Sequence, residues 1–174
     1  ARTGLLRALQ TARAAGARIV FDPNLRPRLW PSTAEMCAAT TEAAAHADIA
    51  LPSHDDEATH FGDADPEATA ARYLAAGAGE VLVKNGGGAM VAGLRVPGST
   101  TAITRLPALA RVAPVDTTGA GDSFNGGYLA ARLQGADPAA AALFGHQIAC
   151  EVIGYRGALL PMSAMIRRVP GTAD

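Results

Sequence analysis

The sequence has little of several features that would point to a special class of protein. Its net charge at pH 7 is −1, with neither a basic excess nor an acidic tail, so the composition gives no sign of a nucleic-acid partner. Lys84 is its one lysine. No apolar run approaches the about 18 residues of a membrane span, so no membrane partner is expected. The two cysteines, Cys37 and Cys150, lie far apart, which favours buried free thiols and a cytoplasmic location.

What remains is an ordinary composition for a single domain, with 174 residues of which 49% are hydrophobic and 18% charged. The first residues, "ARTGLLRALQTARAAGARIVFDPN", have apolar positions at helical spacing followed by a strand-like run, which is not the pattern of a signal peptide. Because α/β domains usually begin with a strand, we interpret this opening helix as the start of an incomplete domain within a longer protein.

Helices and strands alternate along the chain. Apolar periodicity and capping residues predict helices over 3–15, 32–45, 53–61, 65–76, 122–133 and 138–153. Short apolar runs predict strands over 18–22, 48–52 and 80–84. Between 89 and 115, strand-like pieces including "AMVAG", "TAITRL" and "RVAPV" suggest hairpins near a sheet edge. The alternation predicts an α/β fold with a mainly parallel sheet covered by helices on both faces.

The segment "VDTTGAGDSFNGGYLAA", residues 115–131, carries the strongest functional signal. A strand-like piece ends in a glycine-rich loop, and a helix follows from about Asp122. Backbone N–H groups at a helix start are unpaired and favour an anion, above all phosphate. Gly119 and Gly121 allow the backbone to approach a ligand closely. A carboxylate in such a site makes sense if Asp122 is a base that deprotonates the hydroxyl attacking a phosphoryl group.

Other glycine motifs fit this segment less well. A Walker loop needs Gly-Lys-Ser/Thr, and the loop has no lysine. The dinucleotide fingerprint fails because Phe124 stands where the third glycine should be. The serine hydrolases named for Gly-Asp-Ser-Leu carry that motif directly after a first strand, which is not its place here.

"DTTGAGDSFNGGYL", residues 116–129, resembles the C-terminal signature of the PfkB (ribokinase-like) carbohydrate kinases at every restricted position. The resemblance implies that the Gly119, Ala120, Gly121 and Asp122 amides form an anion hole and that Asp122 is the catalytic base and contacts the substrate. It also implies ATP as a cofactor, with Mg²⁺ bound mainly through the phosphates. The chain resembles only the C-terminal half of such a kinase, so residues 1–174 would be the C-terminal part of one ribokinase-like domain whose N-terminal part and lid are missing.

"FDPNLRPRLW", residues 21–30, resembles the Asp-x-Asn-x-Arg segment of the 2-keto-3-deoxygluconate kinases in that family. The resemblance implies that Asn24 and Arg26 contact the sugar acid and the phosphates. From the residues alone, Arg26 follows a strand, where open α/β sheets bind ligands, and a guanidinium there can pair with a carboxylate or phosphate. The alternative is a turn-stabilising asparagine and a surface arginine, and Arg28 is expected to be solvated.

"KNGGGA", residues 84–89, resembles the nucleotide-binding Lys-x-Gly-x-x-Gly of the family, with Ala89 in place of the last glycine. Three consecutive glycines suit a backbone lying beside ATP, whereas a plain turn between strands would need one or two. The ATP-binding residues implied by these resemblances are Lys84, Asn85, Gly86, Gly87, Gly88, Ala89, Gly119 and Gly121.

Three further pairs of residues have spacings that could serve a functional site. Asp56 and His60 share a helix face, but two such residues without a third ligand are usually solvated surface, and no metal site is predicted. His146 and Cys150 lie one helical turn apart, which favours a packed helix face. The family resemblance implies that this helix lies near the adenine of the nucleotide. Asp116 and Thr118 match positions that hold a monovalent cation in some relatives, so a requirement for K⁺ stays open.

The sequence thus predicts an ATP-dependent kinase of a sugar or sugar acid, with 2-keto-3-deoxygluconate, phosphorylated to its 6-phosphate, as the favoured substrate. Fructokinase or ribokinase activity is the alternative within this class. The alternative from another class is an inactive nucleotide-binding fragment. The oligomeric state of the full-length protein, a homo-oligomer included, stays open because the family's dimer contacts mostly use the lid.

Overall fold

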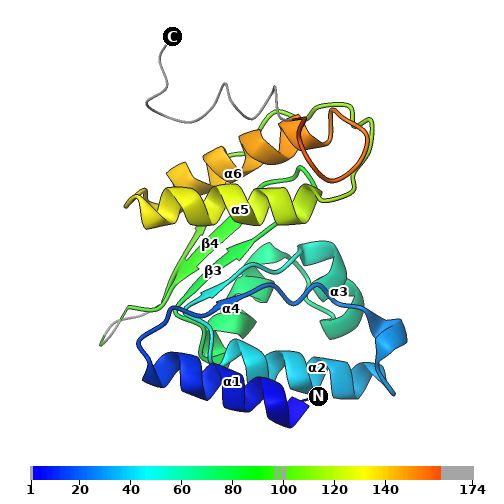
Figure 1. Ribbon diagram of the computed structural model, residues 1–174. Helices are drawn as coiled ribbons and strands as arrows, with labels where there is room; N and C mark the ends of the chain where they lie inside the picture. The colour runs from blue at the N-terminus through cyan, green and yellow to red at the C-terminus, as the bar shows by residue number, and fades with distance from the viewer. Residues whose placement is uncertain (1, 97, 99–100, 162–174) are drawn as a thin grey trace. The chain divides into compact units, whose positions relative to one another are not determined.

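The protein is described by a computed structural model that covers residues 2–96, 98 and 101–161 (Figure 1). Its chain divides into two compact units, Ala1–Ala108 and Leu109–Asp174. Within the described residues, no helix combines the length and the apolar character that a membrane span requires.

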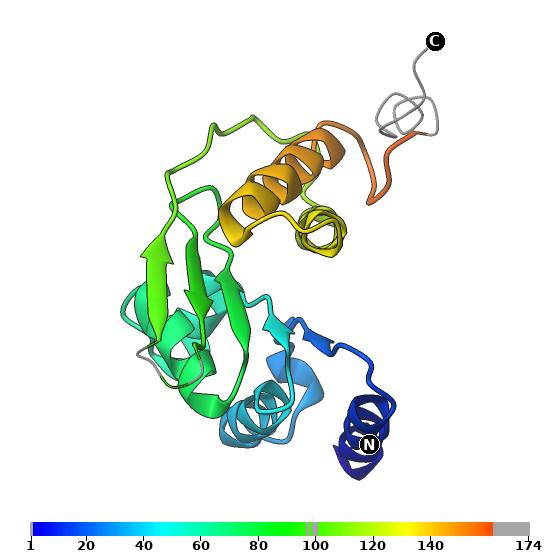
Figure 2. The same ribbon diagram turned by 90° about the vertical axis from the view of Figure 1, so that its left-hand side faces the viewer.

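A mixed sheet organises the first unit. Its described strands are β1 (Val20–Phe21), β2 (Ile49–Ala50), β3 (Glu80–Val83), β4 (Val91–Leu94) and β5 (Ala102–Arg105), and they lie side by side in chain order (Figure 2). The first three strands are parallel, with Val20 opposite Ile49 and Ile49 opposite Glu80. β4 and β5 add antiparallel pairs, so the predicted hairpin is confirmed at one edge of the sheet.

The first unit has four described α-helices, and three of these begin directly after a predicted capping residue, Ser32, Ser53 or Asp65. The four helices are α1 (Arg2–Ala14), α2 (Thr33–Ala44), α3 (His54–Phe61) and α4 (Pro66–Ala76), with a short 3₁₀ helix, η1, at Pro27–Leu29. Ser32 Oγ accepts a hydrogen bond from the Glu35 amide at 3.2 Å, and Asp65 Oδ1 accepts one from the Ala68 amide at 2.7 Å. Each bond satisfies one of the unpaired donors of a helix start.

The core of this unit lies between α4 and the sheet. All four residues of β3 are buried, which is the pattern of a strand that is buried on both of its faces. Tyr73 and Leu74 of α4 pack with Val81, Val83 and Val91 of the strands. A Cβ at Gly93 would lie 2.7 Å from Leu74 Cδ1, so this glycine lets the helix approach β4 closely.

The second unit contains two described helices, α5 (Ala120–Leu133) and α6 (Pro138–Val152). They cross closely because both contribute a glycine: a Cβ at Gly127 would lie 2.9 Å from the Gly145 Cα. The predicted strand at "RVAPV" is wrong. Pro114 has no N–H to donate, and the amides of Val115 and Asp116 instead donate to Ile153 O just after α6, at 2.8 and 3.2 Å.

Candidate functional site

The carboxyl ends of the three parallel strands are tied together by backbone hydrogen bonds. The Leu51 amide donates to Phe21 O at 2.9 Å, and the Lys84 amide donates to Pro52 O at 2.8 Å. Lys84 O in turn accepts from the His54 amide at the start of α3, at 2.8 Å. The predicted substrate segment follows β1 and the predicted nucleotide segment follows β3, so both begin at this edge, where open α/β sheets bind ligands.

Asp22 connects these two segments, although it is not among the site residues predicted from the sequence. Its Oδ2 pairs with Lys84 Nζ at 3.1 Å, and its Oδ1 accepts a hydrogen bond from the Asn24 amide at 3.0 Å. Asn24 has a φ of 38°, the one positive φ among the described residues other than glycine. An asparagine tolerates this conformation, and the Asp22 carboxylate stabilises the turn that contains it. The signal available in the sequence was an acidic residue ending a strand beside the predicted site.

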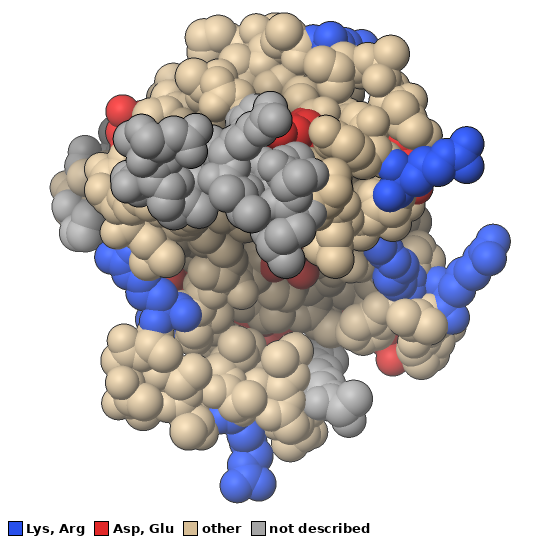
Figure 3. Space-filling view, turned by 45° about the horizontal axis from the view of Figure 1, so that its top comes forward, with Lys and Arg blue, Asp and Glu red and all other residues tan. Residues whose placement is uncertain are grey.

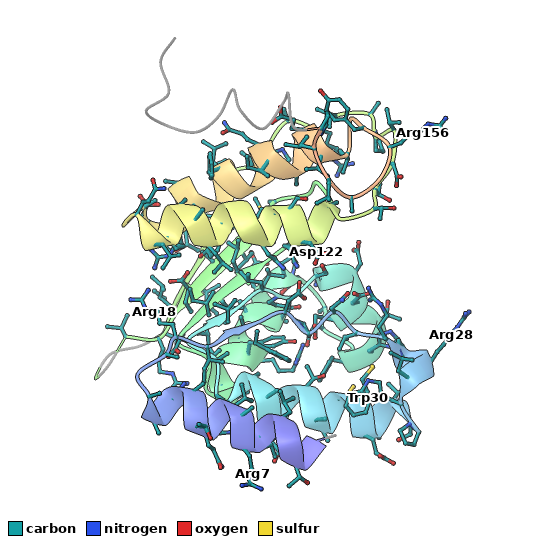
Figure 4. The ribbon with its side chains drawn as sticks, viewed as in Figure 1. Arg7, Arg18, Arg28, Trp30, Asp122 and Arg156 are labelled. Carbon is teal, nitrogen blue, oxygen red and sulfur yellow. The ribbon has the colours of Figure 1, made fainter. Side chains whose placement is uncertain are left out.

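The side chains of Asn24 and Arg26 are exposed, while Leu25 between them is buried and anchors the loop. Arg26 Nη1 donates to Leu25 O at 2.8 Å, and the residue stands directly before η1. Arg28 extends away from the protein into solvent, as predicted (Figure 4). Arg26 therefore presents a guanidinium just beyond β1, on a loop whose backbone is fixed on one side by Asp22 and Leu25.

The glycines after Lys84 form a tight turn between β3 and β4. Gly86 and Gly87 have φ values of 48° and 87°, and the Gly88 amide donates to Asn85 O. A Cβ at Gly88 would lie 2.7 Å from Asn85 Nδ2. The turn itself therefore requires all three glycines, more than the one or two expected of a plain turn. Asn85 Nδ2 donates to Ala89 O at 3.0 Å and closes the loop.

In the second unit, the glycine loop leads directly into α5. Gly119 is its N-cap with a φ of 75°, and a Cβ there would lie 2.8 Å from Ala158 Cβ and 3.0 Å from Ala158 O. The Ala120 amide donates to Thr117 O at 3.2 Å, and the Ser123 amide donates to Gly119 O at 2.9 Å. Within the described chain, the amides of Gly121 and Asp122 donate no hydrogen bond. These two N–H groups and the helix dipole are suited to an anion.

Asp122 stands in the first turn of α5 with an exposed side chain (Figure 4). Its carboxylate has no hydrogen-bond or ion-pair partner within the residues that the structure describes. Such a carboxylate can accept a proton from a ligand hydroxyl, because it does not first have to break a hydrogen bond to a described residue.

Asp116 ties the start of this loop to the segment after α6. Its Oδ1 accepts from the Thr118 amide at 2.9 Å and from Thr118 Oγ1 at 2.7 Å, and its Oδ2 accepts from the Gly157 amide at 2.9 Å. These bonds, the Thr118 hydroxyl first, lower the pKa of Asp116 to about 2. Asp116 therefore stays ionised at neutral pH and holds 116–119 against the loop that carries Gly157.

A buried ionic network supports α3 and α4. Arg72 Nη2 donates to Glu57 Oε2 at 2.6 Å and to Asp63 Oδ2 at 2.7 Å, and the Tyr73 hydroxyl donates to Glu57 Oε1 at 2.9 Å. The Arg72 guanidinium also lies 3.7 Å from the centroid of the Phe61 ring. Burial raises the pKa of Glu57, and the two donors oppose that shift. Both carboxylate oxygens of Glu57 are thus satisfied, as a buried charge requires.

Two further predicted pairs lie on helices, His146 with Cys150 on α6 and Asp56 with His60 on α3. Cys150 Sγ lies 3.3 Å from His146 Nε2, which itself lies 2.8 Å from Ala110 O, so this face of α6 is packed against the segment before α5. Neither cysteine forms a disulfide, and burial raises the pKa of both thiols. Asp56 and His60 belong to no group of three or more potential metal ligands within the described ranges. On the face drawn in Figure 3, basic side chains lie at several places, most of them near the edge of the view.

Comparison with known proteins identifies the family. The model of the pfkB family of carbohydrate kinases matches residues 2–165. The chain belongs to the pfkB family. This pfkB chain is 40% identical, over 166 residues, to the 2-dehydro-3-deoxygluconokinase of Dickeya dadantii, covering 94% of the chain and 52% of that protein. It is 36% identical over 137 residues to the fructokinase of Vibrio alginolyticus, covering 78% of the chain and 42% of that protein.

Solved structures confirm the ribokinase-like α/β fold. A PfkB protein from Polaromonas sp. JS666 superposes with a TM-score of 0.74 at 29% identity, over 94% of this chain and 50% of that one. A putative ribokinase II from Escherichia coli, in complex with ATP and Mg²⁺, has a TM-score of 0.70 at 28% identity, over 88% of this chain and 48% of that one. The pfkB chain thus spans about half the length of the relatives that it matches.

Proposed function

We propose that the whole protein is an ATP-dependent kinase of a sugar acid, 2-keto-3-deoxygluconate (2-dehydro-3-deoxygluconate), which it converts to the 6-phosphate. The observation that carries this proposal is the 40% identity to 2-dehydro-3-deoxygluconokinases over 94% of the chain. Residues 1–174 would then be the C-terminal part of a single kinase domain to which both compact units belong. The free cysteines favour a cytoplasmic location for it.

In this proposal, Asp122 accepts the proton of the attacking hydroxyl. The exposed carboxylate in the first turn of α5 has no competing partner within the described residues, which leaves it available to a substrate. The N–H groups of Gly121 and Asp122 would stabilise negative charge on the transferred phosphoryl group, in the anion hole formed with Gly119 and Ala120. The Ala120 amide already donates to Thr117 O, so we expect it to contribute less to anion binding than the amides of Gly121 and Asp122 do.

In the first unit, the residues proposed to bind the nucleotide are Lys84, Asn85, Gly86, Gly87, Gly88 and Ala89. In the second unit, they are Gly119 and Gly121. We expect Mg²⁺ to bind mainly through the ATP phosphates, where it neutralises charge in phosphoryl transfer. Asp116 and Thr118 supply oxygen atoms of the kind that a K⁺ ion would need, and we include K⁺ as a candidate activator.

Arg26 supports the choice of an acidic sugar. Its guanidinium is exposed just beyond β1, in the position from which it can pair with a carboxylate. Fructose and ribose lack that carboxylate, so Arg26→Ala should reduce kcat/KM for 2-keto-3-deoxygluconate by about tenfold or more and leave neutral sugars unaffected. Arg28→Ala, two residues away and solvated, is the matched control and should change neither.

The test is ADP release with ATP and Mg²⁺ in the presence of 2-keto-3-deoxygluconate, fructose or ribose. It should use the 174-residue chain beside a polypeptide extended to the full length of the relatives. Turnover with the sugar acid alone supports the proposal. Turnover with fructose or ribose, together with no effect of Arg26→Ala, would support kinase activity but contradict the choice of a sugar acid as the substrate.

A second candidate follows from the length of the chain. Because it spans about half of its relatives, the 174-residue chain by itself would be a nucleotide-binding fragment without turnover. A site that does not exclude water from the phosphoryl group transfers it poorly. ATP binding by the short chain, with turnover confined to the extended polypeptide, would support this function for the short chain.

A further inference from the structure

We propose that Asp22 is a positioning residue that fixes the sugar-binding loop and the nucleotide-binding lysine relative to each other. This inference rests on the proposed kinase function. One oxygen of its carboxylate accepts from the Asn24 amide at 3.0 Å, and the other pairs with Lys84 Nζ at 3.1 Å. A single side chain therefore acts on both segments that are proposed to bind the two substrates.

The contact crosses the width of a strand. β1 and β3 are separated by β2 in the sheet, and Asp22 and Lys84 follow the outer two strands of this trio. The Lys84 side chain therefore reaches across the end of β2, beside the backbone bonds that join Leu51 to Phe21 and Lys84 to Pro52. The ion pair adds a side-chain connection to the same edge of the sheet, and it is largely shielded, with 12% of the Lys84 side chain and 28% of the Asp22 side chain exposed.

Lysine benefits from such a partner more than most residues. Its ammonium is a point charge on a flexible four-carbon stem, and fixing that stem costs rotamer freedom. When Asp22 holds the stem across the strand ends before ATP binds, that cost is met on folding. A nucleotide then meets a lysine that is already oriented, so loss of the partner should weaken ATP binding by about tenfold.

The loop that carries Asn24 and Arg26 depends on the other oxygen. Asn24 lies in the left-handed region, and its amide bond to Asp22 Oδ1 closes an Asx turn. Without that bond the turn loses the acceptor that favours its conformation. The direction in which Arg26 leaves the loop then varies, and sugar-acid binding weakens more than ATP binding does.

Two substitutions separate these roles. Asn in place of Asp22 has one acceptor oxygen where the carboxylate uses two, and asparagine forms Asx turns well, so Asp22→Asn keeps the turn and loses the ion pair. Glu is one methylene longer, so Asp22→Glu keeps a charge within reach of Lys84 and loses the turn. Asp22→Ala removes both. Asp48→Asn is the matched control, because Asp48 also bonds a backbone amide beside β1, that of Ile19 at 2.7 Å, and pairs with a basic side chain, Arg13, at 3.5 Å.

The kinetic test uses the extended polypeptide. Asp22→Asn should raise KM for ATP about tenfold and leave KM for the sugar acid within about twofold, and Asp22→Glu should do the reverse. Asp48→Asn should change neither. The proposal is overturned if Asp22→Asn leaves ATP affinity unchanged or increases it, or if all three substitutions at position 22 weaken both substrates equally.

A second readout does not depend on turnover. Lys84 is the one lysine of the 174-residue chain, so lysine labelled with ¹³C at Cε gives a single NMR signal from this side chain. Asp22→Asn should move the signal while Asp48→Asn leaves it in place, and ATP with Mg²⁺ should shift it in the wild type. Absence of turnover in the extended wild type with every sugar would count against the proposed function alone. A wild-type Lys84 signal whose chemical shift does not change at saturating ATP and Mg²⁺ would overturn the positioning role.

Discussion

The Asp116 carboxylate accepts a hydrogen bond from the amide of Gly157, 41 residues further along the chain, at 2.9 Å. The same carboxylate accepts from the amide and hydroxyl of Thr118. The loop before α5 and the loop after α6 are therefore joined through one charged group. Ala158, next to Gly157, lies against Gly119 so closely that no Cβ fits between them. The backbone of the proposed anion hole is thus fixed by contacts behind it.

Acid should release this connection. The pKa of Asp116 is lowered from its ordinary value of 3.8 to about 2, so the group stabilises the folded state fully above about pH 4, and this contribution is lost as the pH falls towards 2. In ¹H–¹⁵N spectra the Gly157 amide should titrate with a midpoint near 2. The Gly154 amide, which donates to Glu151 O, is the internal control. A Gly157 signal that is flat between about pH 5 and 2, or one that still titrates there in Asp116→Asn, would contradict this.

Gly119→Ala should loosen the start of α5. The residue has a φ of 75°, and the added Cβ would lie 2.8–3.0 Å from atoms of Ala158, so we expect a local cost of about 1–3 kcal/mol. Hydrogen exchange of amides in the first turns of α5 should accelerate accordingly. Gly126→Ala in the same helix is the control, because no described atom outside the local helix backbone lies within 4 Å of its Cβ position, and it should stabilise α5 by about 0.5–1 kcal/mol. Equal effects of the two substitutions would show that the contact with Ala158 is unimportant.

Tyr73→Phe should destabilise the first unit by about 1–3 kcal/mol. The change removes the donor to Glu57 Oε1 and leaves that oxygen of a fully buried carboxylate without this bond. Urea unfolding followed by circular dichroism measures the loss. Tyr155→Phe, at an exposed tyrosine, should cost less than about 0.5 kcal/mol. If the two variants unfold alike, the hydrogen bond from Tyr73 to Glu57 contributes nothing to stability.

Much of the fold could be predicted because its signals are local. Ser32 and Asp65 cap the helices that they were expected to cap, and the glycine-rich loop leads into a helix as its composition indicates. The strand predicted at "RVAPV" is wrong because its amides find Ile153 O, an acceptor that sequence proximity does not reveal.

The contacts that organise the candidate site could not be predicted in the same way. The Asp22–Lys84 pair joins residues 62 positions apart, and it depends on the order of three strands. Glu57 lies in a helix turn with two other acidic residues and would be expected in solvent, yet it is fully buried because Arg72 and Tyr73 face it from α4. The run of glycines at 86–88 is visible in the sequence. The reason that the turn needs glycine there is not, because it depends on the φ values of Gly86 and Gly87 and on the position of Asn85.

The central claim is that Asp122 is the base of a phosphoryl transfer, and Asp122→Asn tests it most directly. The measurement is ADP release with ATP, Mg²⁺ and 2-keto-3-deoxygluconate in the extended polypeptide. We expect kcat to fall by about 10²–10⁴ with the melting temperature unchanged, because the exposed Asp122 side chain has no partner in the described structure to lose. Glu35→Gln, an exposed carboxylate in the first turn of α2, should retain full activity. An Asp122→Asn enzyme that keeps wild-type turnover would contradict the account.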